Sequence, residues 1–325
     1  MDKRVETLDQ AILLDSSLGP QVFDRLSLAQ KELGLVHGDR PTCPFLRPHL
    51  LNRVQYEQIK SAAETIARAL EKVASEALKS RSLMDLLCLS PVEEAMARIG
   101  PGYSTLSVTS RLDSYITSDG FHFLEYNAEN PAGVGDQMQL EKVLFTLPVL
   151  KSFLSSHSHW LPRPHQALLT SLLKAYRDWG GETEKPHIAI VDWRGVPTGS
   201  EFRVLQDYFV ECGYPTVIGD PEDLTYNGDR LCLDGFEIDI LYKRVLIHEF
   251  LDRFDQAHPL VRAYKDRRVF MANSFRSKLA HKKASFVVLT DSFYHYLFEP
   301  DELAAIRKHI PWTRLVKPSR TEFGG

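Results

Sequence analysis

The sequence predicts a multi-domain protein of mixed α+β and α/β class. Helical patterns fill the first hundred residues, a β-hairpin pattern covers residues 104–128, and helices alternate with strands after residue 165. The chain has 325 residues, of which 43% are hydrophobic and 25% charged, so it is long enough for two or three units with separate cores. We expect those units at residues 1–164, 165–265 and 266–325.

Amphipathic helices form the expected scaffold of the first unit. Apolar residues recur at intervals of three and four from Ile59 through Ile66 to Ala77, a pattern typical of a helix packed on a core. Further helices are expected at residues 84–96 and 137–154. The first unit is therefore predicted to be a helical region that carries the hairpin.

The segment 155–164, rich in serine, histidine and proline, predicts a boundary between units. The run Ile188-Ala189-Ile190-Val191 is apolar at every position, which is typical of a strand buried on both faces of a parallel sheet. The middle unit is therefore predicted to be an α/β layer with a partly parallel sheet. Its expected helices are 165–178 and 200–212, and its expected strands are 187–193, 215–218, 230–233 and 236–243.

Composition argues against several classes of partner. The net charge is −4 and no dense block of Lys and Arg occurs, so we expect neither nucleic acid nor a membrane surface as a partner. The N-terminus lacks an apolar leader, and no apolar run of about 18 residues could span a bilayer, so a cytoplasmic location is expected. The cysteines form no CxxC pair and are expected to be ordinary buried thiols: Cys43, Cys88, Cys212 and Cys232.

The second strand of the hairpin carries two candidate metal ligands. Residues two apart in a strand share a face, so Glu125 and Asn127 point one way while Leu124 and Tyr126 point the other. Carboxylate and amide oxygens are ligands that Mg²⁺ prefers in proteins. The pair therefore predicts a magnesium site.

The first strand adds two more polar groups if the turn has the expected length. A three-residue loop, 118–120, with its glycine at positive φ would place Asp113 opposite Glu125 and Arg111 opposite Asn127. A two-residue loop would instead turn Arg111 and Asp113 to the opposite face. The alternative interpretation is a solvated strand edge with cross-strand salt bridges.

Three further segments suggest contacts with phosphate. The turn-rich loop 130–136 lies before a helix and could present backbone amides to an anion. Lys282 and Lys283 stand at an expected helix start, where the helix dipole is unfavourable to them unless an anion binds. Residues 314–317 are expected to form a strand that ends at Lys317, followed by a glycine-rich turn that could hold polyphosphate. The alternatives are exposed lysines and a surface tail.

Taken in order, these motifs resemble those of the circularly permuted ATP-grasp proteins. That group includes eukaryotic glutathione synthetase and glutathionylspermidine synthase, and the resemblance is greatest to its uncharacterised bacterial members. It extends from residue 100 to the end of the chain, although the spacing from Lys-Pro to glycine is one residue longer than in glutathione synthetase. The motifs are Arg111-x-Asp113, a hairpin glycine, Glu125-x-Asn127, Lys282-Lys283 and Lys317-Pro318-x-Arg320-x-Glu322-x-Gly324-Gly325.

The resemblance implies a carbon–nitrogen ligase that uses ATP and Mg²⁺ to join a small-molecule carboxylate to an amine through an acyl phosphate. It implies catalytic roles for Arg111 and Asp113, with Arg111 touching the substrate or the transferring phosphate. The implied magnesium ligands are Glu125, Asn127 and Glu322. The implied ATP-binding residues are Lys282, Lys283, Lys317, Arg320, Gly324 and Gly325.

The same resemblance assigns the middle unit to the substrate side. Asp192 and Arg244 lie at its expected strand ends, and Arg244 could meet an acidic substrate or form a salt bridge at the sheet edge. A complete member of the group continues past Gly325. We therefore expect the chain to be truncated within its glycine loop, which would leave the fragment inactive by itself.

Two rival functions are open at this point. One is a non-catalytic ATP-grasp-like protein that binds nucleotide or serves as a scaffold. The other is a metal-dependent hydrolase that uses Asp113 and Glu125 with His157 and His159, although an HxH pair in a serine-rich linker is more often a solvated loop. The identities of the acid and the amine are not encoded in any motif. The oligomeric state is likewise open, a homo-oligomer included.

Overall fold

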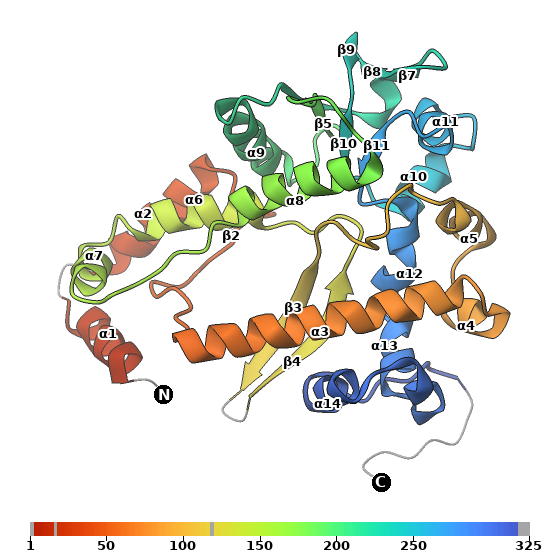
Figure 1. The fold of residues 1–325 in the computed structure, drawn as a ribbon. Helices are drawn as coiled ribbons and strands as arrows, with labels where there is room; N and C mark the ends of the chain where they lie inside the picture. The colour runs from red at the N-terminus through yellow and green to blue at the C-terminus, as the bar shows by residue number, and fades with distance from the viewer. Residues whose placement is uncertain (1–2, 16–17, 118–119, 318–325) are drawn as a thin grey trace.

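The computed structural model describes residues 3–15, 18–117 and 120–317. Within them the protein is a mixed α/β fold with a four-stranded parallel sheet, a long hairpin and many helices (Figure 1). The helices are α1 (Lys3–Leu14), α2 (Pro20–Glu32), α3 (Arg53–Ala77), α4 (Arg81–Leu86), α5 (Pro91–Arg98), α6 (Val134–Leu144), α7 (Pro148–Ser155), α8 (Pro164–Trp179), α9 (Gly199–Glu211), α10 (Ile247–Arg253), α11 (Pro259–Lys265), α12 (Lys278–His281), α13 (Ala284–Thr290) and α14 (Pro300–His309). The described residues also include the 3-10 turns η1 (Pro221–Asp223), η2 (Phe275–Ser277) and η3 (Ser292–Leu297).

The strands form four separate sheets. Their bounds are β1 (Val36–His37), β2 (Arg40–Pro41), β3 (Arg111–Thr117), β4 (Gly120–Asn127), β5 (Ile188–Val191), β6 (Thr216–Gly219), β7 (Leu224–Tyr226), β8 (Leu231–Leu233), β9 (Phe236–Glu237), β10 (Ile240–Lys243) and β11 (Phe270–Ala272). The pairs are β1–β2 and the hairpin β3–β4, and the larger sheets have the orders β7-β8-β9 and β11-β10-β5-β6.

The long helix α3 confirms the predicted amphipathic helix and starts earlier than expected. Asn52 caps its first turn in a capping box with Gln55. Its buried face, which includes Ile66, packs in one core with Phe123 of β4 and Ile306 of α14. Figure 1 shows α3 running across the hairpin toward α12 and α13. Residues expected in the first and third units therefore share one core.

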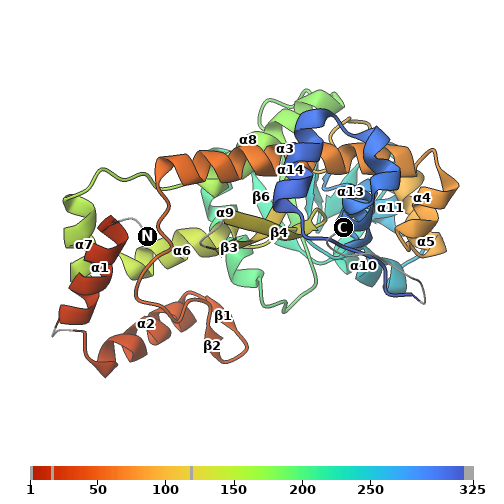
Figure 2. The same cartoon turned by 90° about the horizontal axis from the view of Figure 1, so that it is seen from below.

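Two expected helices are each divided in two. The stretch 84–96 contains the end of α4 and most of α5, because Ser90 caps a new helix that begins at Pro91. The stretch 137–154 contains α6 and α7, and the second of these begins at Pro148, which cannot continue the first. Together with α1 and α2, α6 and α7 enclose a small core at one end of the molecule (Figure 2).

The parallel sheet confirms the expected α/β layer. All three of its strand pairs are parallel, and every residue of β5 is buried. Ile188 and Ile190 pack with α8 and α9 on one face, whereas Ala189 and Val191 pack with α10 and α11 on the other. The strand β11 lies beyond residue 265, so the sheet extends past the boundary expected there.

The strand expected at residues 314–317 is not present. Residues 311–316 have no regular secondary structure. Their backbone is held by a side chain instead of a neighbouring strand, because Thr290 Oγ1 donates to the carbonyl of Thr313 and accepts from its amide, at 3.1 and 3.3 Å. Arg314 adds a hydrogen bond to the Thr290 carbonyl. This prediction was wrong.

The cysteines are free thiols, but the expectation that they are buried is wrong. Cys88 is exposed, and the other three are partly exposed. Cys88 lies in the turn between α4 and α5 with a φ of 55°, where its side chain has no core to enter.

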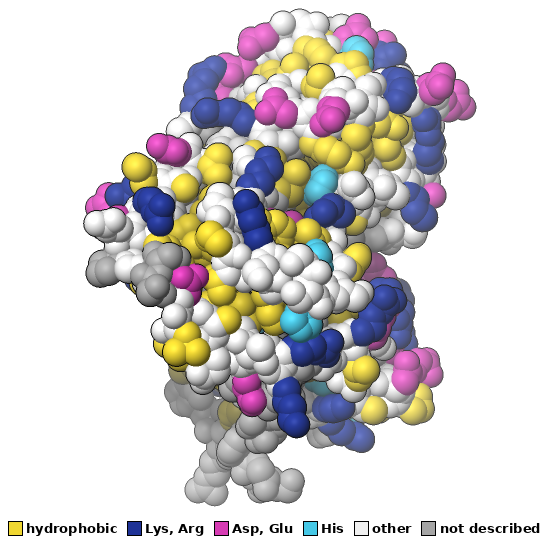
Figure 3. Space-filling view, turned by 90° about the vertical axis from the view of Figure 1, so that its left-hand side faces the viewer, with side chains coloured by type: hydrophobic (Ala, Val, Ile, Leu, Met, Phe, Trp, Pro, Cys, Tyr) yellow, Lys and Arg dark blue, Asp and Glu magenta, His cyan; other side chains and the backbone are white. Residues whose placement is uncertain are grey.

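The surface carries a mixture of side chains. On the face drawn in Figure 3, Lys and Arg side chains are spread among hydrophobic, acidic and uncharged ones. Several exposed apolar residues lie on α1 and α2, among them Leu14 and Leu28. In the three described ranges, no helix combines the length and apolar character needed to cross a bilayer.

Candidate functional site

The register of the β3–β4 hairpin places four polar side chains opposite one another. Arg111 pairs with Asn127, and Asp113 pairs with Glu125, as the sequence predicts. We call these four residues the hairpin cluster. The observed register excludes the arrangement in which Arg111 and Asp113 face away from Glu125 and Asn127.

The hairpin reaches this register by an unexpected route. Thr117 already pairs with Gly120, so two residues separate the strands where three were expected. That shorter loop alone would turn Asp113 away, but the register shifts by one residue beside Asp113, and Leu124 is the extra residue of the bulge. The shift restores the pairing with Glu125. The sequence predicts that Leu124 and Tyr126 share a face of β4. Leu124 is 50% exposed whereas Tyr126 is buried, so this prediction was wrong for Leu124.

Hydrogen bonds join the members of the hairpin cluster. Arg111 Nε donates to Asp113 Oδ1 at 2.8 Å. Asn127 Nδ2 donates to Asp113 Oδ1 at 3.2 Å and to Glu125 Oε1 at 3.0 Å. The two carboxylates are therefore close enough to share one amide group.

Lys283 completes the cluster from a distant part of the sequence. Its Nζ lies 3.1 Å from Glu125 Oε2, and the side chains of Lys283 and Glu125 are 70% and 31% exposed. The hydrogen bond from Asn127 and the ammonium of Lys283 hold the pKa of Glu125 below its ordinary value. Lys283 occupies the N-cap position, directly before the first residue of α13, which confirms the expected helix start. Lys282 instead lies 3.2 Å from Glu93.

The donor set of the cluster fits a magnesium ion. Mg²⁺ takes oxygen ligands, usually one or two carboxylates with substrate phosphates and water. Asp113 and Glu125 supply two carboxylates that accept hydrogen bonds from one Asn127 amide, and the ammonium of Lys283 neutralises Glu125. Among the described residues, no three His, Cys, Asp or Glu side chains are placed to hold a metal ion. An ion here would therefore depend on the Asn127 amide and on oxygens of a ligand.

Five predicted residues near the C-terminus remain largely untested. Arg320, Glu322, Gly324 and Gly325 lie outside the described residues. Lys317 is exposed, and its role in binding ATP stays a prediction.

The loop after β4 connects the hairpin cluster to the carboxyl edge of the parallel sheet. Arg111 Nη1 donates to the carbonyl of Ala132 at 2.9 Å. Arg244, which follows β10, donates to the carbonyl of Pro131 at 2.5 Å. Two arginines from different units thus bind neighbouring carbonyls of one loop.

Glu201, on α9, occupies the amides of this loop. Its Oε1 accepts hydrogen bonds from the amides of Gly133 and Gly135 at 2.9 and 3.1 Å. A Cβ atom at Gly135 would lie 2.9 Å from Glu201 Cγ, so only glycine fits there. The loop therefore binds an anion as the sequence suggests, but the anion is the protein's own carboxylate. Sequence reasoning missed Glu201, because nothing local connects it to a loop 66 residues away.

Arg244 and Asp192 lie at the point where the order of strands reverses. The chain runs from β5 to β6 on one side and later to β10 and β11 on the other, and such points commonly bind ligands. Arg244 is 2% exposed and lies 3.7 Å from Glu201, so the salt-bridge alternative is realised. Burial raises the pKa of Asp192, against a hydrogen bond from the amide of Trp193 and the charge of Arg244.

A second group of charges missed by sequence reasoning is buried behind the hairpin cluster. Its members are Glu93, Glu129, Lys243 and Lys278, each at most 5% exposed. Burial lowers the pKa of Lys243 to about 8, although Glu129 opposes this shift. Buried charges of this kind require partners. These partners lie far apart in the chain, so no local pattern could have indicated them.

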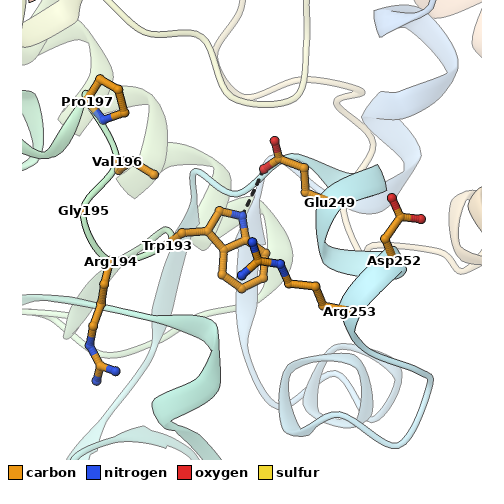
Figure 4. Close-up of a pocket in the computed structure, with 8 residues that line it drawn as sticks. All are labelled: Trp193, Arg194, Gly195, Val196, Pro197, Glu249, Asp252 and Arg253. Carbon is orange, nitrogen blue, oxygen red and sulfur yellow. Dashed lines mark hydrogen bonds between the residues drawn. The ribbon is translucent and has the colours of Figure 1, made fainter. Parts of the chain in front are cut away.

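An open cavity of about 510 Å³ lies beside the end of β5 (Figure 4). Trp193 is at its centre, with Nε1 donating to Glu249 Oε2 at 3.0 Å. The guanidinium of Arg253 lies 4.0 Å from the centroid of the same ring. Among the predicted site residues that the structure describes, none lines this cavity.

The histidine pair of the hydrolase alternative is tied to the backbone. The Nδ1 atoms of His157 and His159 lie 2.8 and 3.0 Å from the carbonyl oxygens of Phe153 and His157. Within the described residues the pair makes no contact with the hairpin cluster, so the hydrolase alternative has no geometric support.

Comparisons with known proteins show a likeness among solved structures. No protein-family model matches the chain, and none of the curated proteins matches it. Among solved structures, it is similar to the apo form of the glutathione synthetase-like effector GSS30 from Globodera pallida. The TM-score is 0.58 at 12% sequence identity, over 89% of this chain and 69% of that chain.

The fold of this chain is therefore similar to that of a glutathione synthetase-like effector, and at 12% identity the likeness is one of fold.

Proposed function

We propose that the protein is an ATP-dependent carbon–nitrogen ligase of circularly permuted ATP-grasp type, which joins a carboxylate to an amine through an acyl phosphate. The observation that carries this proposal is the meeting of the hairpin cluster with Lys283. Two oxygen-rich side chains and a lysine, from segments more than 150 residues apart, converge on a fold similar to that of a glutathione synthetase-like protein.

The residues of the cluster have separable tasks in this proposal. Glu125 and Asn127 would hold a magnesium ion, with Asp113 beside them, and bound MgATP would supply the phosphoryl group. Arg111 already uses Asp113 and a loop carbonyl to fix its guanidinium. From that position it can neutralise charge on a carboxylate or on the transferring phosphate. No protein nucleophile is needed, because positioning and electrostatics supply most of the rate.

Lys283 is suited to exchange between a carboxylate and a phosphate. An ion pair between exposed side chains contributes only about 0–1 kcal/mol, so Lys283 can leave Glu125 at little cost. A metal ion on Glu125 would repel the ammonium and free it for an anionic ligand. We therefore propose that Lys283 exchanges Glu125 for a phosphate group when a nucleotide binds.

Positional isotope exchange in ATP tests the proposed reaction. ATP labelled with ¹⁸O in the β,γ-bridge is incubated with the full-length protein, magnesium and panels of carboxylic acids without amine. Reversible formation of an acyl phosphate scrambles the label, whereas formation of AMP would contradict the proposal. Glu125→Gln is expected to abolish exchange. The matched control His122→Gln, an exposed residue of β4 that pairs with Tyr115, is expected to retain it.

The same experiment separates the ligase from a non-catalytic relative. The similar solved structure is described as an effector, which makes a protein that binds nucleotide without ligation a real rival. That rival predicts binding of MgATP with no exchange for any acid in the panel.

A further inference from the structure

Residues 278–283 lie along the end of the β3–β4 hairpin and are attached at two points, one on β4 and one on the segment that follows it. Lys283 reaches Glu125 at 3.1 Å, and Lys278 reaches Glu129 at 2.6 Å. His281 approaches the same Glu129 carboxylate at 3.8 Å. The short helix α12 and the turn after it are therefore fastened to the hairpin by paired charges.

The two attachments differ sharply in burial. The side chains of Glu129 and Lys278 are 0% and 4% exposed, whereas those of Glu125 and Lys283 are 31% and 70% exposed. Loss of one partner from a buried pair is strongly destabilising, because the other charge is left without compensation. An exposed pair exchanges readily with solvent or ligand. The buried Lys278–Glu129 pair is thus a permanent attachment, whereas a ligand can replace the exposed Lys283–Glu125 pair.

Glu129 is also held from a third direction. Its Oε2 accepts a hydrogen bond from the amide of Ile247, at the start of α10, at 2.8 Å. Burial pushes the pKa of Glu129 upward, but Lys243, Lys278 and His281 outweigh this and leave the pKa below its ordinary value. Glu129 therefore connects the segment after β4 with α10 and α12.

Glu93 reinforces the same arrangement. Its carboxylate lies 3.2 Å from Lys278 and 3.2 Å from Lys282. Lys282 is consequently turned away from the hairpin cluster, and its neighbour Lys283 is the lysine that faces Glu125. The buried charges thus select which member of the lysine pair meets the candidate site.

We propose that Glu129 is a positioning residue, which anchors residues 278–283 through Lys278 so that Lys283 stands beside Glu125 and can receive the phosphates of a nucleotide. Glu129 is fully enclosed and cannot itself touch a ligand. The inference rests on the proposed function, since it assigns Lys283 to phosphate. It goes further by identifying the residue through which that lysine is placed.

Hydrogen–deuterium exchange tests the anchoring step without any ligand. Glu129→Gln keeps an oxygen for the amide of Ile247 but removes the charge that holds Lys278. Amide exchange over residues 278–284 is expected to accelerate by at least about tenfold, because removal of one partner of a buried ion pair lowers the free energy of local opening, which sets the exchange rate. Unchanged exchange there would overturn the proposal. If this variant does not fold, Glu129→Asp, which retains the charge on a shorter side chain, serves for the same comparison.

Glu302→Gln is the matched control. Glu302 is 3% exposed and lies 2.7 Å from Lys72, so it is also a buried carboxylate paired with a lysine, but on α14. Its replacement is expected to accelerate exchange over residues 300–310 and to leave residues 278–284 unchanged. Equal acceleration of residues 278–284 in both variants would show a general loosening and contradict the proposal.

A double-mutant cycle on MgATP affinity separates positioning from a merely structural role. Glu129→Gln is expected to weaken binding about tenfold in the wild-type background. In a Lys283→Ala background the same change is expected to have no effect, because the residue through which it acts is gone. An equal loss in both backgrounds would overturn the proposal. If the wild-type protein binds no MgATP, the proposed function fails, and the exchange comparison still decides whether Glu129 anchors the segment.

Discussion

Replacement of Lys278 by methionine is the most informative perturbation of stability. Its ammonium lies 2.6 Å from Glu129 and 3.2 Å from Glu93, and its side chain is 4% exposed. Removal of one partner from a buried ion pair costs roughly 3–5 kcal/mol. Lys243 remains near Glu129 and Lys282 remains at Glu93, so we expect the lower end, about 3 kcal/mol. At roughly 2 °C per kcal/mol, the melting temperature would fall by about 6 °C.

Urea unfolding at pH 7.5 measures this effect against two comparison variants. Lys283→Met, at a site 70% exposed, is expected to change the free energy of unfolding by less than about 0.5 kcal/mol. The double variant Lys278→Met with Glu129→Gln is expected to be more stable than Lys278→Met alone by about 1 kcal/mol or more, because the orphaned charge is gone. The reasoning is refuted if Lys278→Met unfolds like Lys283→Met, or if the double variant is the less stable.

Three further predictions concern the hairpin, the pH dependence and the metal. Phe123→Ala is expected to lower the free energy of unfolding in urea by about 3–5 kcal/mol, because Phe123 is 1% exposed. Leu124→Ala is expected to lower it by less than about 1 kcal/mol. Equal losses of stability in the two variants would contradict the bulge at Leu124. Burial lowers the pKa of His309, although the hydrogen bond to the carbonyl of Phe121 opposes this shift. The unfolded state therefore binds more protons at this residue than the folded state does. The stability of the protein should fall as the pH drops below about 6.5, the ordinary pKa of histidine. His309→Phe is therefore expected to reduce the loss of stability between pH 7.5 and 5.5, and an unchanged loss would argue against it. Chelation of magnesium is expected to weaken ATP binding measured by calorimetry, since the ion would supply positive charge between the carboxylates of the cluster and the phosphates; undiminished binding in the chelator would exclude the metal role of the cluster.

Elements with a strong periodic signal could be predicted from the sequence. The spacing of Ile59, Ile66 and Ala77 predicts α3, and the uninterrupted apolar run at Ile188–Val191 predicts the central strand β5. The helix start at Lys283 also follows from sequence. Strand 314–317 failed because local β-propensity cannot supply a pairing partner, and a side chain of α13 binds that backbone instead.

The hairpin cluster was predicted correctly through two errors that cancel. The loop is one residue shorter than expected, and the bulge at Leu124 restores the register. No local sequence pattern predicts the loop length or the bulge. The bulge places Phe123 on the buried face of β4 and leaves Glu125 on the polar face, so the observed register suits both side chains. Burial pattern therefore determined the register more reliably than turn chemistry.

The buried pair of Glu129 and Lys278 could not be predicted from sequence. Glu129 and Lys278 meet only because α3, β4 and α12 share one core, and charged residues in helices and loops are usually solvated. Glu201 is a similar case, since its partners Gly133 and Gly135 become visible only when α6 and α9 pack together. Such tertiary pairs require the assembled fold.

Calorimetric titration with MgATP shows directly whether the hairpin cluster and Lys283 form a nucleotide site. The account predicts saturable binding to the wild-type protein, a large loss in Lys283→Ala and in Asn127→Leu, and little change in the control His122→Gln. Absence of heat at millimolar nucleotide in the full-length protein, or equal binding by all four proteins, would contradict the assignment of the hairpin cluster and Lys283 to a nucleotide site.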